Sequence, residues 1–157
     1  MDKLEIEGGV RLRGKVKISG AKNAALPIMT AAMLADGERF FRNVPDLKDL
    51  DTLGDLLGYM GAEVHRDGEA RTVQIDTDRL SKWDAPYEHV KKMRDSVLVL
   101  GPLVARFGRA RVSLPGGCAI GARPIDQHLK GLSLMGAEIT IDGGFVHAEA
   151  PKGLRGT

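Results

Sequence analysis

The chain has 157 residues, 43% hydrophobic and 28% charged, which is typical of a globular domain that buries a core of its own. Lys and Arg number 23 against 21 Asp and Glu, and this net charge of +2 argues against a general nucleic-acid or membrane surface. The single cysteine, Cys118, excludes an internal disulfide framework, and no stretch approaches the ~20 apolar residues of a membrane span. We therefore expect a soluble cytoplasmic protein.

The first half of the chain begins with two strands and a helix. Alternating apolar residues predict strands over 3–7 and 12–18. An Ala-, Leu- and Met-rich segment then predicts a helix over 21–35, in which Pro27 is tolerable only near the first turn. A strand is expected over 37–42.

A second helix is expected after Asp46, whose side chain suits an N-cap, and should end at Gly61. Its apolar residues fall on one face: Leu47, Leu50, Leu53, Leu57 and Met60. A hairpin with strands over 62–66 and 70–75 should then form around a two-residue turn at Asp67-Gly68.

The second half predicts a similar series of elements. A long helix should follow Pro86 and carry the basic cluster 91–94 on a charged face. A strand over 109–114 and a helix over 124–135 come next. A hairpin turned at Asp142-Gly143 completes the series.

An offset of 75 residues relates the two halves. Met60-Gly61-Ala62-Glu63 recurs as Met135-Gly136-Ala137-Glu138. The same offset relates three further pairs: Asp67-Gly68 with Asp142-Gly143, Asp51 with Asp126, and Pro27 with Pro102. We infer two copies of one strand–helix–strand–helix–strand–strand module, about 1–76 and 77–150, in a mixed, layered α/β fold.

The second copy has four extra residues in the loop before its last helix. There, residues 115–124 read Pro-Gly-Gly-Cys-Ala-Ile-Gly-Ala-Arg-Pro. The glycines would let 115–122 act as a lid, although a merely long turn fits the pattern too. Arg123 would favour a thiolate at Cys118, but spacing alone leaves a reactive and an inert cysteine equally open. At a helix start Arg123 also suits a phosphate, with a solvated surface arginine as the alternative.

Lys22 and Asn23 open the first long helix, where an ammonium and an amide can hold an anionic ligand. The alternative is an ordinary solvated lysine. No metal and no cofactor are expected, because the sequence has no phosphate-loop or dinucleotide fingerprint and its histidines lack metal-ligand spacing. These histidines are His65, His89, His128 and His147.

Three stretches resemble a known family. Residues 18–28, Ile-Ser-Gly-Ala-Lys-Asn-Ala-Ala-Leu-Pro-Ile, are similar to the N-terminal signature of the UDP-N-acetylglucosamine enolpyruvyl transferases. Residues 114–124 resemble their catalytic loop, and 101–108, Gly-Pro-Leu-Val-Ala-Arg-Phe-Gly, also match. The resemblance runs over the whole chain.

The resemblance implies an inside-out α/β barrel fold with two similar domains, each built from three such modules with helices inside and sheets outside. Strands within 1–21 would belong to the second domain, and 22–157 would form the first domain, incomplete here. Family members are considerably longer, so we expect this chain to be an N-terminal fragment. The leucine face of the second helix would then be exposed, and the chain alone should be inactive.

The implied reaction moves the enolpyruvyl group of phosphoenolpyruvate to the 3-hydroxyl of UDP-N-acetylglucosamine and releases phosphate, as the first committed step of peptidoglycan synthesis. By resemblance Cys118 donates the proton to the methylene carbon and can add covalently to the substrate. Lys22, Asn23 and Arg123 match family positions that bind phosphoenolpyruvate. Positions that bind the nucleotide sugar match Arg94, Arg123, Pro124, Ile125, Asp126 and Gln127. The family commonly has Leu at position 127, so the Gln127 contact is left open.

Two other readings are kept open. The related transferase that acts on shikimate 3-phosphate shares the module but lacks the cysteine loop. A non-catalytic nucleic-acid-binding α/β module would need a clustered basic face with exposed aromatics, whereas aromatic residues make up only 4% of this chain.

Overall fold

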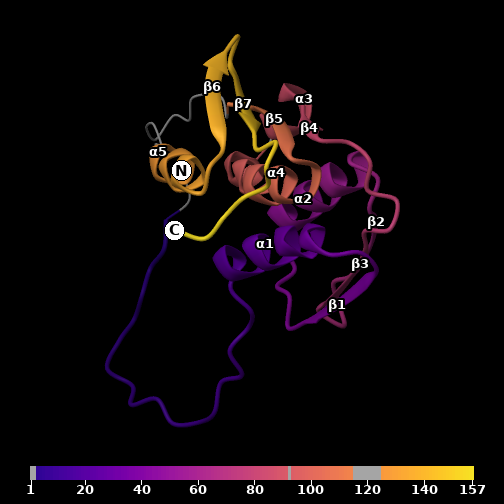
Figure 1. Cartoon of the computed structure of the whole chain (residues 1–157). Helices are drawn as coiled ribbons and strands as arrows, with labels where there is room; N and C mark the ends of the chain where they lie inside the picture. Colours follow the sequence, from indigo (N-terminus) through magenta and orange to yellow (C-terminus); the bar gives the residue numbers. More distant parts are fainter. Residues whose placement is uncertain (1–2, 92, 115–124) are drawn as a thin grey trace.

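The computed structural model describes residues 3–91, 93–114 and 125–157, with the backbone alone at Arg94 (Figure 1). Within these ranges seven strands form two sheets, which confirms the mixed α/β class. The strands of the first sheet are β1 (Glu38–Arg42), β2 (Glu63–Asp67) and β3 (Thr72–Asp76), in the order β1-β3-β2. Those of the second are β4 (Asp84–Ala85), β5 (Arg109–Ser113), β6 (Glu138–Asp142) and β7 (Phe145–Glu149), in the order β4-β5-β7-β6. Among the pairings of these described strands, β4–β5 is parallel and the others are antiparallel.

Helices pack at the centre of the molecule and the sheets lie outside them (Figure 1). The α-helices are α1 (Lys22–Ala31), α2 (Lys48–Tyr59), α3 (Tyr87–Val90), α4 (Leu100–Phe107) and α5 (Asp126–Leu134). Two 3₁₀ turns, η1 (Ala32–Leu34) and η2 (Arg94–Val99), lead out of α1 and into α4. Within the described ranges, none of these helices has the length and apolar character needed to cross a bilayer.

The repeat inferred from the sequence is visible in the order of elements. β2 and β6 are related by the offset of 75 residues, and each pairs with the next strand as an antiparallel hairpin. α1, β1 and α2 precede the first hairpin, whereas α4, β5 and α5 precede the second. Each hairpin follows a helix that ends just before a glycine with positive φ, Gly61 (+107°) or Gly136 (+97°). Only glycine adopts such a backbone conformation readily.

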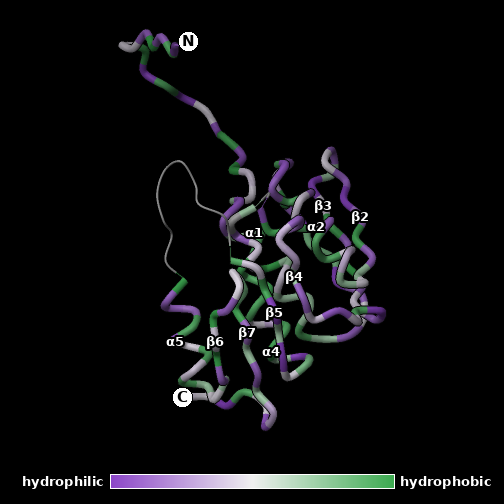
Figure 2. The backbone as a smooth tube through the Cα atoms, turned by 90° about the horizontal axis from the view of Figure 1, so that it is seen from above, coloured by the Kyte–Doolittle hydropathy of each residue, from purple (hydrophilic) through white to green (hydrophobic). Residues whose placement is uncertain are grey.

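The segments 3–7 and 12–18, expected as strands, pair with no sheet in the described part of the chain. Residues 3–20 run as extended chain away from the body of the molecule (Figure 2). The apolar side chains stay in solvent, with Leu4 96% and Leu12 93% exposed. Alternating apolar and polar residues allow a segment to form a β-strand, but a strand also needs a hydrogen-bonding partner. No sheet in the described part of the chain provides one for residues 3–20.

Limited digestion with trypsin should therefore cut first within 3–20. Arg11, Arg13, Lys15 and Lys17 lie in exposed backbone without secondary structure, where proteases act fastest. Arg66 is the internal control, because it lies in β2 with only 14% of its side chain exposed. Mass spectrometry of a digestion time course measures the order of cleavage. Cleavage after Arg66 as early as after Arg13 would contradict this description.

Three local predictions around the first module are wrong. The N-cap of α2 is Leu47, because Asp46 instead forms an ion pair with Arg66 at 2.5 Å. The first hairpin turns over four residues, 68–71, because Asp67 is paired with Thr72 in the β2–β3 ladder. Within the turn, the Asp67 carboxylate accepts a hydrogen bond from the Ala70 N–H. Pro27 is the sixth residue of α1 and lies beyond its first turn, so α1 forgoes one main-chain hydrogen bond there.

The long helix expected after Pro86 is interrupted. α3 ends at Val90, and the chain resumes a helical course only at Arg94. Between them Met93 is extended, with φ −146° and ψ 119°, and is 5% exposed. Burial of Met93 thus takes precedence over helix continuity. The second hairpin agrees more closely, because two glycines with positive φ, Gly143 and Gly144, connect β6 to β7.

The leucine face of α2 is buried, which overturns the expectation that it would be exposed. Leu50, Leu53 and Leu57 are 0% exposed, and only Leu47, outside the helix, reaches 42%. The helix in the equivalent place, α5, differs, because none of its residues is buried and Leu134 is 62% exposed. Exposed apolar side chains therefore include Leu134 of α5 and those of 3–20.

Tyr59 joins the two modules. Its hydroxyl donates a hydrogen bond to Asp84 of β4 at 3.1 Å, and its ring lies 4.6 Å from the ring of His89 in α3. Burial, followed by the charge and the hydrogen bond of Asp84, raises the pKa of the Tyr59 phenol. The phenol therefore stays protonated and remains a donor at neutral pH.

Arg106 makes a second connection. From α4 its guanidinium donates to the carbonyls of Met33 and Thr77 at 3.0 and 3.1 Å and forms an ion pair with Asp36. The side chain is only 16% exposed. It thus satisfies one main-chain carbonyl in η1 and another at the boundary between the two modules.

Arg106→Met should reduce the free energy of unfolding by about 2–3 kcal/mol, because charged hydrogen bonds are lost and two carbonyls lose their donor. Arg79→Met is the matched control: its side chain is 82% exposed and pairs with Glu63, and such surface pairs contribute about 0–1 kcal/mol. Urea unfolding of the two variants measures the difference. Equal losses would refute the role given to Arg106.

Candidate functional site

The N-terminus of α1 carries Lys22 and Asn23, two of the residues that the sequence predicts in a ligand site. Gly20 fixes where this helix begins, because a Cβ there would lie 1.8 Å from the carbonyl oxygen of Asn43. That approach is possible only for glycine. The start of α1 therefore packs closely against the backbone that follows β1. The unpaired main-chain N–H groups of the first turn of α1 add a partial positive charge beside Lys22.

Lys22 forms an ion pair with Asp49, the second residue of α2. The distance from its Nζ to Oδ2 is 2.7 Å, and the two side chains are 41% and 38% exposed. Lys22 and Asp49 are 27 residues apart in sequence, and their contact links the starts of α1 and α2. A lysine held between a carboxylate and a helix N-terminus presents a fixed positive charge that is still accessible to a ligand.

Asn23 lies on a different side of α1, next to η2. With Leu26, Pro27, Asp95 and Leu98 it lines a pocket of about 180 Å³. Asp95 follows Arg94, whose backbone begins η2 and whose side chain lies outside the description. The structure therefore brings the start of α1 and the start of η2 together, as a shared site for Asn23 and Arg94 requires.

Cys118, Arg123 and Pro124, which the sequence predicts in a catalytic loop, lie outside the described residues. The chain on either side of them is well anchored. β5 leads to Leu114, whose N–H donates to the carbonyl of Gly144 at 2.8 Å. On the far side Ile125 is the N-cap residue of α5 and packs, half-buried, against the core.

The remaining predicted sugar contacts, Asp126 and Gln127, begin α5. Both side chains are exposed, and the Gln127 amide donates to the Asp126 carboxylate at 3.1 Å. A carboxylate and an amide at a helix start offer an acceptor and a donor to a polar ligand. The structure thus places these two on a different element from Lys22 and Asn23.

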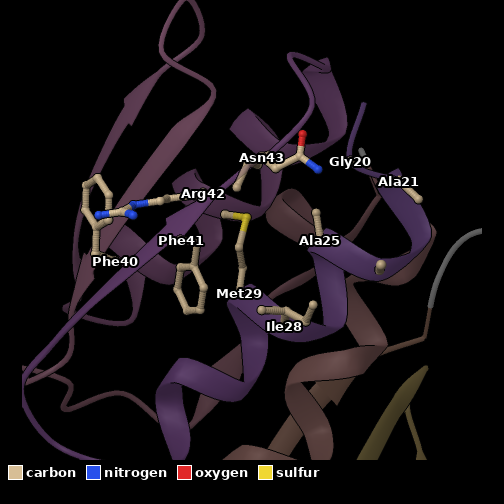
Figure 3. A pocket seen from close by; sticks show the side chains of 11 residues that line it. Gly20, Ala21, Ala25, Ile28, Met29, Phe40, Phe41, Arg42 and Asn43 are labelled. Atoms are coloured by element: carbon tan, nitrogen blue, oxygen red, sulfur yellow. The ribbon is translucent and has the colours of Figure 1, made fainter. Parts of the chain in front are cut away.

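A pocket of about 380 Å³ lies on the opposite side of α1 from Asn23 (Figure 3). Its lining is apolar apart from Arg42 and Asn43, and includes Ala25, Ile28 and Phe41. Residues 21, 24, 25 and 28 face it, whereas 23, 26 and 27 face the pocket beside η2, as helical periodicity requires. This pocket contains none of the predicted site residues.

Sequence reasoning missed two acidic residues near the candidate site, Asp49 and Asp95. Each lies in the first turn of its own helical segment, where carboxylates are common because of the helix dipole. Nothing in the sequence connects Asp49 with a lysine 27 positions earlier. Among the described residues, no cluster of three His, Cys, Asp or Glu side chains could hold a metal ion.

Comparisons with known proteins place these features in context. The sequence model of EPSP synthase (3-phosphoshikimate 1-carboxyvinyltransferase) matches residues 6–157. A UDP-N-acetylglucosamine 1-carboxyvinyltransferase from Anaeromyxobacter sp. (strain K) is 66% identical over 159 residues, covering 100% of this chain and 38% of the relative. UDP-N-acetylglucosamine 1-carboxyvinyltransferase 2 from Staphylococcus saprophyticus is 52% identical over 158 residues, again covering 100% and 38%.

Solved structures agree with the sequence matches. The enolpyruvyl transferase NikO from Streptomyces tendae superimposes with a TM-score of 0.76 at 28% identity, covering 94% of this chain and 32% of that one. An EPSP synthase from Acinetobacter baumannii gives 0.66 at 21% identity, with 92% and 33% covered, which is a likeness of fold alone.

Fold and sequence together assign the chain to the fold that these relatives share. The chain belongs to the EPSP synthase family, and it spans about 38% of the length of the curated relatives it matches.

Proposed function

We propose that this chain provides one side of the active site of a UDP-N-acetylglucosamine enolpyruvyl transferase. The observation that carries the proposal is the 52–66% identity, over essentially the whole chain, to curated relatives with this activity in their names. The Pro-Gly-Gly-Cys loop supports it, since the residues around Cys118 are those of the family's catalytic loop. The reaction would occur in the cytoplasm, as a step of peptidoglycan synthesis.

In the proposed reaction, residues of this chain donate a proton and stabilise negative charge. The Cys118 thiol gives its proton to the methylene carbon of phosphoenolpyruvate, which makes the neighbouring carbon electrophilic. The 3-hydroxyl of the sugar adds to that carbon and gives up its proton. The tetrahedral ketal then loses a proton from the methyl carbon just formed and expels phosphate, which restores the carbon–carbon double bond in the enolpyruvyl product. Lys22 and Arg123 stabilise the phosphate and carboxylate charge that changes during these steps, with Asn23 at the edge of the same site.

The nucleotide sugar is assigned to a second group of residues. These are Arg94 and the segment that leads into α5: Arg123, Pro124, Ile125, Asp126 and Gln127. The proximity of η2 to the start of α1 supports a shared cleft for both substrates. Arginine suits the diphosphate because its planar group donates two parallel hydrogen bonds.

We also propose a division into domains. Strands within 1–21 pair with a sheet of a second domain, and 22–157 belong to a first domain that further modules would complete. The exposed alternating apolar residues of 3–20 and the uncovered surface of α5 support this arrangement. In that arrangement the second domain closes the other side of the cleft.

The test uses a chimera in which this chain replaces the matched segment of the Anaeromyxobacter sp. (strain K) relative. Phosphate release from phosphoenolpyruvate is measured with UDP-N-acetylglucosamine and, separately, with shikimate 3-phosphate as acceptor. We expect turnover with the nucleotide sugar alone. Turnover only with shikimate 3-phosphate, or none with either acceptor in a folded chimera, would refute the proposed substrate.

A further inference from the structure

The contact between Lys22 and Asp49 joins two rigid elements through one flexible side chain. α1 is fixed by Leu26 and Met29, which are 1% and 0% exposed, and α2 is fixed by Leu50 and Leu53, both 0% exposed. The helix backbones therefore cannot shift independently of the core. What remains free to move is the four-carbon stem of Lys22, and the 2.7 Å contact with Asp49 restricts it.

This restriction matters little for stability. Both side chains are more than one-third exposed, and ion pairs of that kind contribute little to folding because solvent and salt screen them. It matters more for binding, because a lysine carries substantial rotamer entropy that a ligand would otherwise have to remove. Asp49 accepts a hydrogen bond from the Lys22 ammonium at 2.7 Å.

From this geometry we propose that Asp49 is a positioning residue that holds the Lys22 ammonium in place for the anionic enolpyruvyl donor. The inference rests on the proposed function, because it takes Lys22 to contact phosphoenolpyruvate. Asp49 acts through Lys22 and does not touch the substrate. Asp49 lies in the first turn of α2, where the helix dipole attracts negative charge. The N-cap residue of this helix, Leu47, makes no side-chain cap.

The test must separate this positioning effect of Asp49 from electrostatic repulsion between its carboxylate and the substrate. A carboxylate near the site repels an anionic substrate, so removing it would strengthen binding if repulsion outweighed positioning. Repulsion acts at a distance through water and is screened, whereas positioning acts through a direct 2.7 Å contact. We therefore expect positioning to dominate.

Kinetics of the chimera test this inference. Asp49→Ala should lower kcat/KM for phosphoenolpyruvate about tenfold and leave the KM for UDP-N-acetylglucosamine within about twofold, because only Lys22 loses its support. Asp49→Glu should recover much of the loss, since a carboxylate is restored. Asp55→Asn is the matched control, because it removes a negative charge from the exposed surface of the same helix, six residues further on. It should change neither constant by more than about twofold.

A double-mutant cycle separates positioning from a structural effect. In a Lys22→Ala background, Asp49→Ala should cause little further loss, because the partner through which it acts has gone. The proposal would be overturned if the losses of kcat/KM in Lys22→Ala and Asp49→Ala multiplied in the double variant. It would also be overturned if Asp49→Ala lost no more than Asp55→Asn, or if it bound phosphoenolpyruvate more tightly than the parent. An inactive parent chimera would instead refute the proposed function. Circular dichroism melting of every variant should give midpoints unchanged from the parent, and a fall for Asp49→Ala would assign it to folding.

Discussion

Replacing Cys118 with serine in the chimera is expected to lower kcat for enolpyruvyl transfer by about a hundredfold or more. The proposed step needs an acid that can protonate carbon, and a hydroxyl is a far weaker acid than a thiol. Cys118→Asp should retain measurable activity, because a carboxylic acid can also deliver a proton. Steady-state phosphate release with UDP-N-acetylglucosamine measures both variants.

The control for this prediction is the binding of the nucleotide sugar. Cys118 is not among the residues assigned to UDP-N-acetylglucosamine, so binding of that substrate, measured by calorimetry, should stay within about twofold in both variants. Full turnover in Cys118→Ser would remove Cys118 from the role of proton donor.

The 157-residue chain on its own is expected to release no phosphate above background from phosphoenolpyruvate and UDP-N-acetylglucosamine. Lys22 and Asn23 could contact a ligand from one side only, and nothing in the described chain closes the opposite side. Binding on one side contributes little to rate when contacts that form in the transition state are missing. The chain should also tend to associate, because apolar side chains of 3–20 and of α5 are exposed.

Purified chain of verified mass, assayed beside the chimera at equal concentration, decides this prediction. Sedimentation or light scattering on the same sample reports association. Turnover of the chain close to that of the chimera would contradict it.

Local sequence patterns predicted most of the helices and strands. β1, β5 and α2 were found within a few residues of their observed ends, because apolar periodicity and Gly61 define them locally. The 75-residue offset correctly indicated equivalent hairpins, since β2 and β6 keep that offset. Predictions of this kind succeed where neighbours in sequence decide the structure.

The errors occur where tertiary contacts decide. Asp46 satisfies the rule for an N-cap, yet the Arg66 guanidinium from β2 competes for it. Burial of Met93 interrupts a helix that propensity alone would continue. Residues 3–20 have the alternation of strands, but no sheet in the described chain offers them an edge.

The candidate site was predicted unevenly for the same reason. Lys22 and Asn23 are at the start of α1 as expected, and Arg94 begins a 3₁₀ turn beside them where a long helix was predicted. Asp49 could not have been found, since its partner is 27 residues away and only the packing of α1 on α2 brings the two together. The assignments of Cys118 and Arg123 stay predictions.

The most direct test of the account is to locate the reactive thiol. The chimera is incubated with UDP-N-acetylglucosamine and fosfomycin, which we expect to alkylate Cys118 because residues 114–124 resemble the family's catalytic loop. It is then digested and mapped by mass spectrometry. The account predicts that the peptide containing Cys118 carries the alkyl group and that activity falls in proportion to its labelling. An active chimera that is unmodified, or that is modified only at another cysteine, would contradict it.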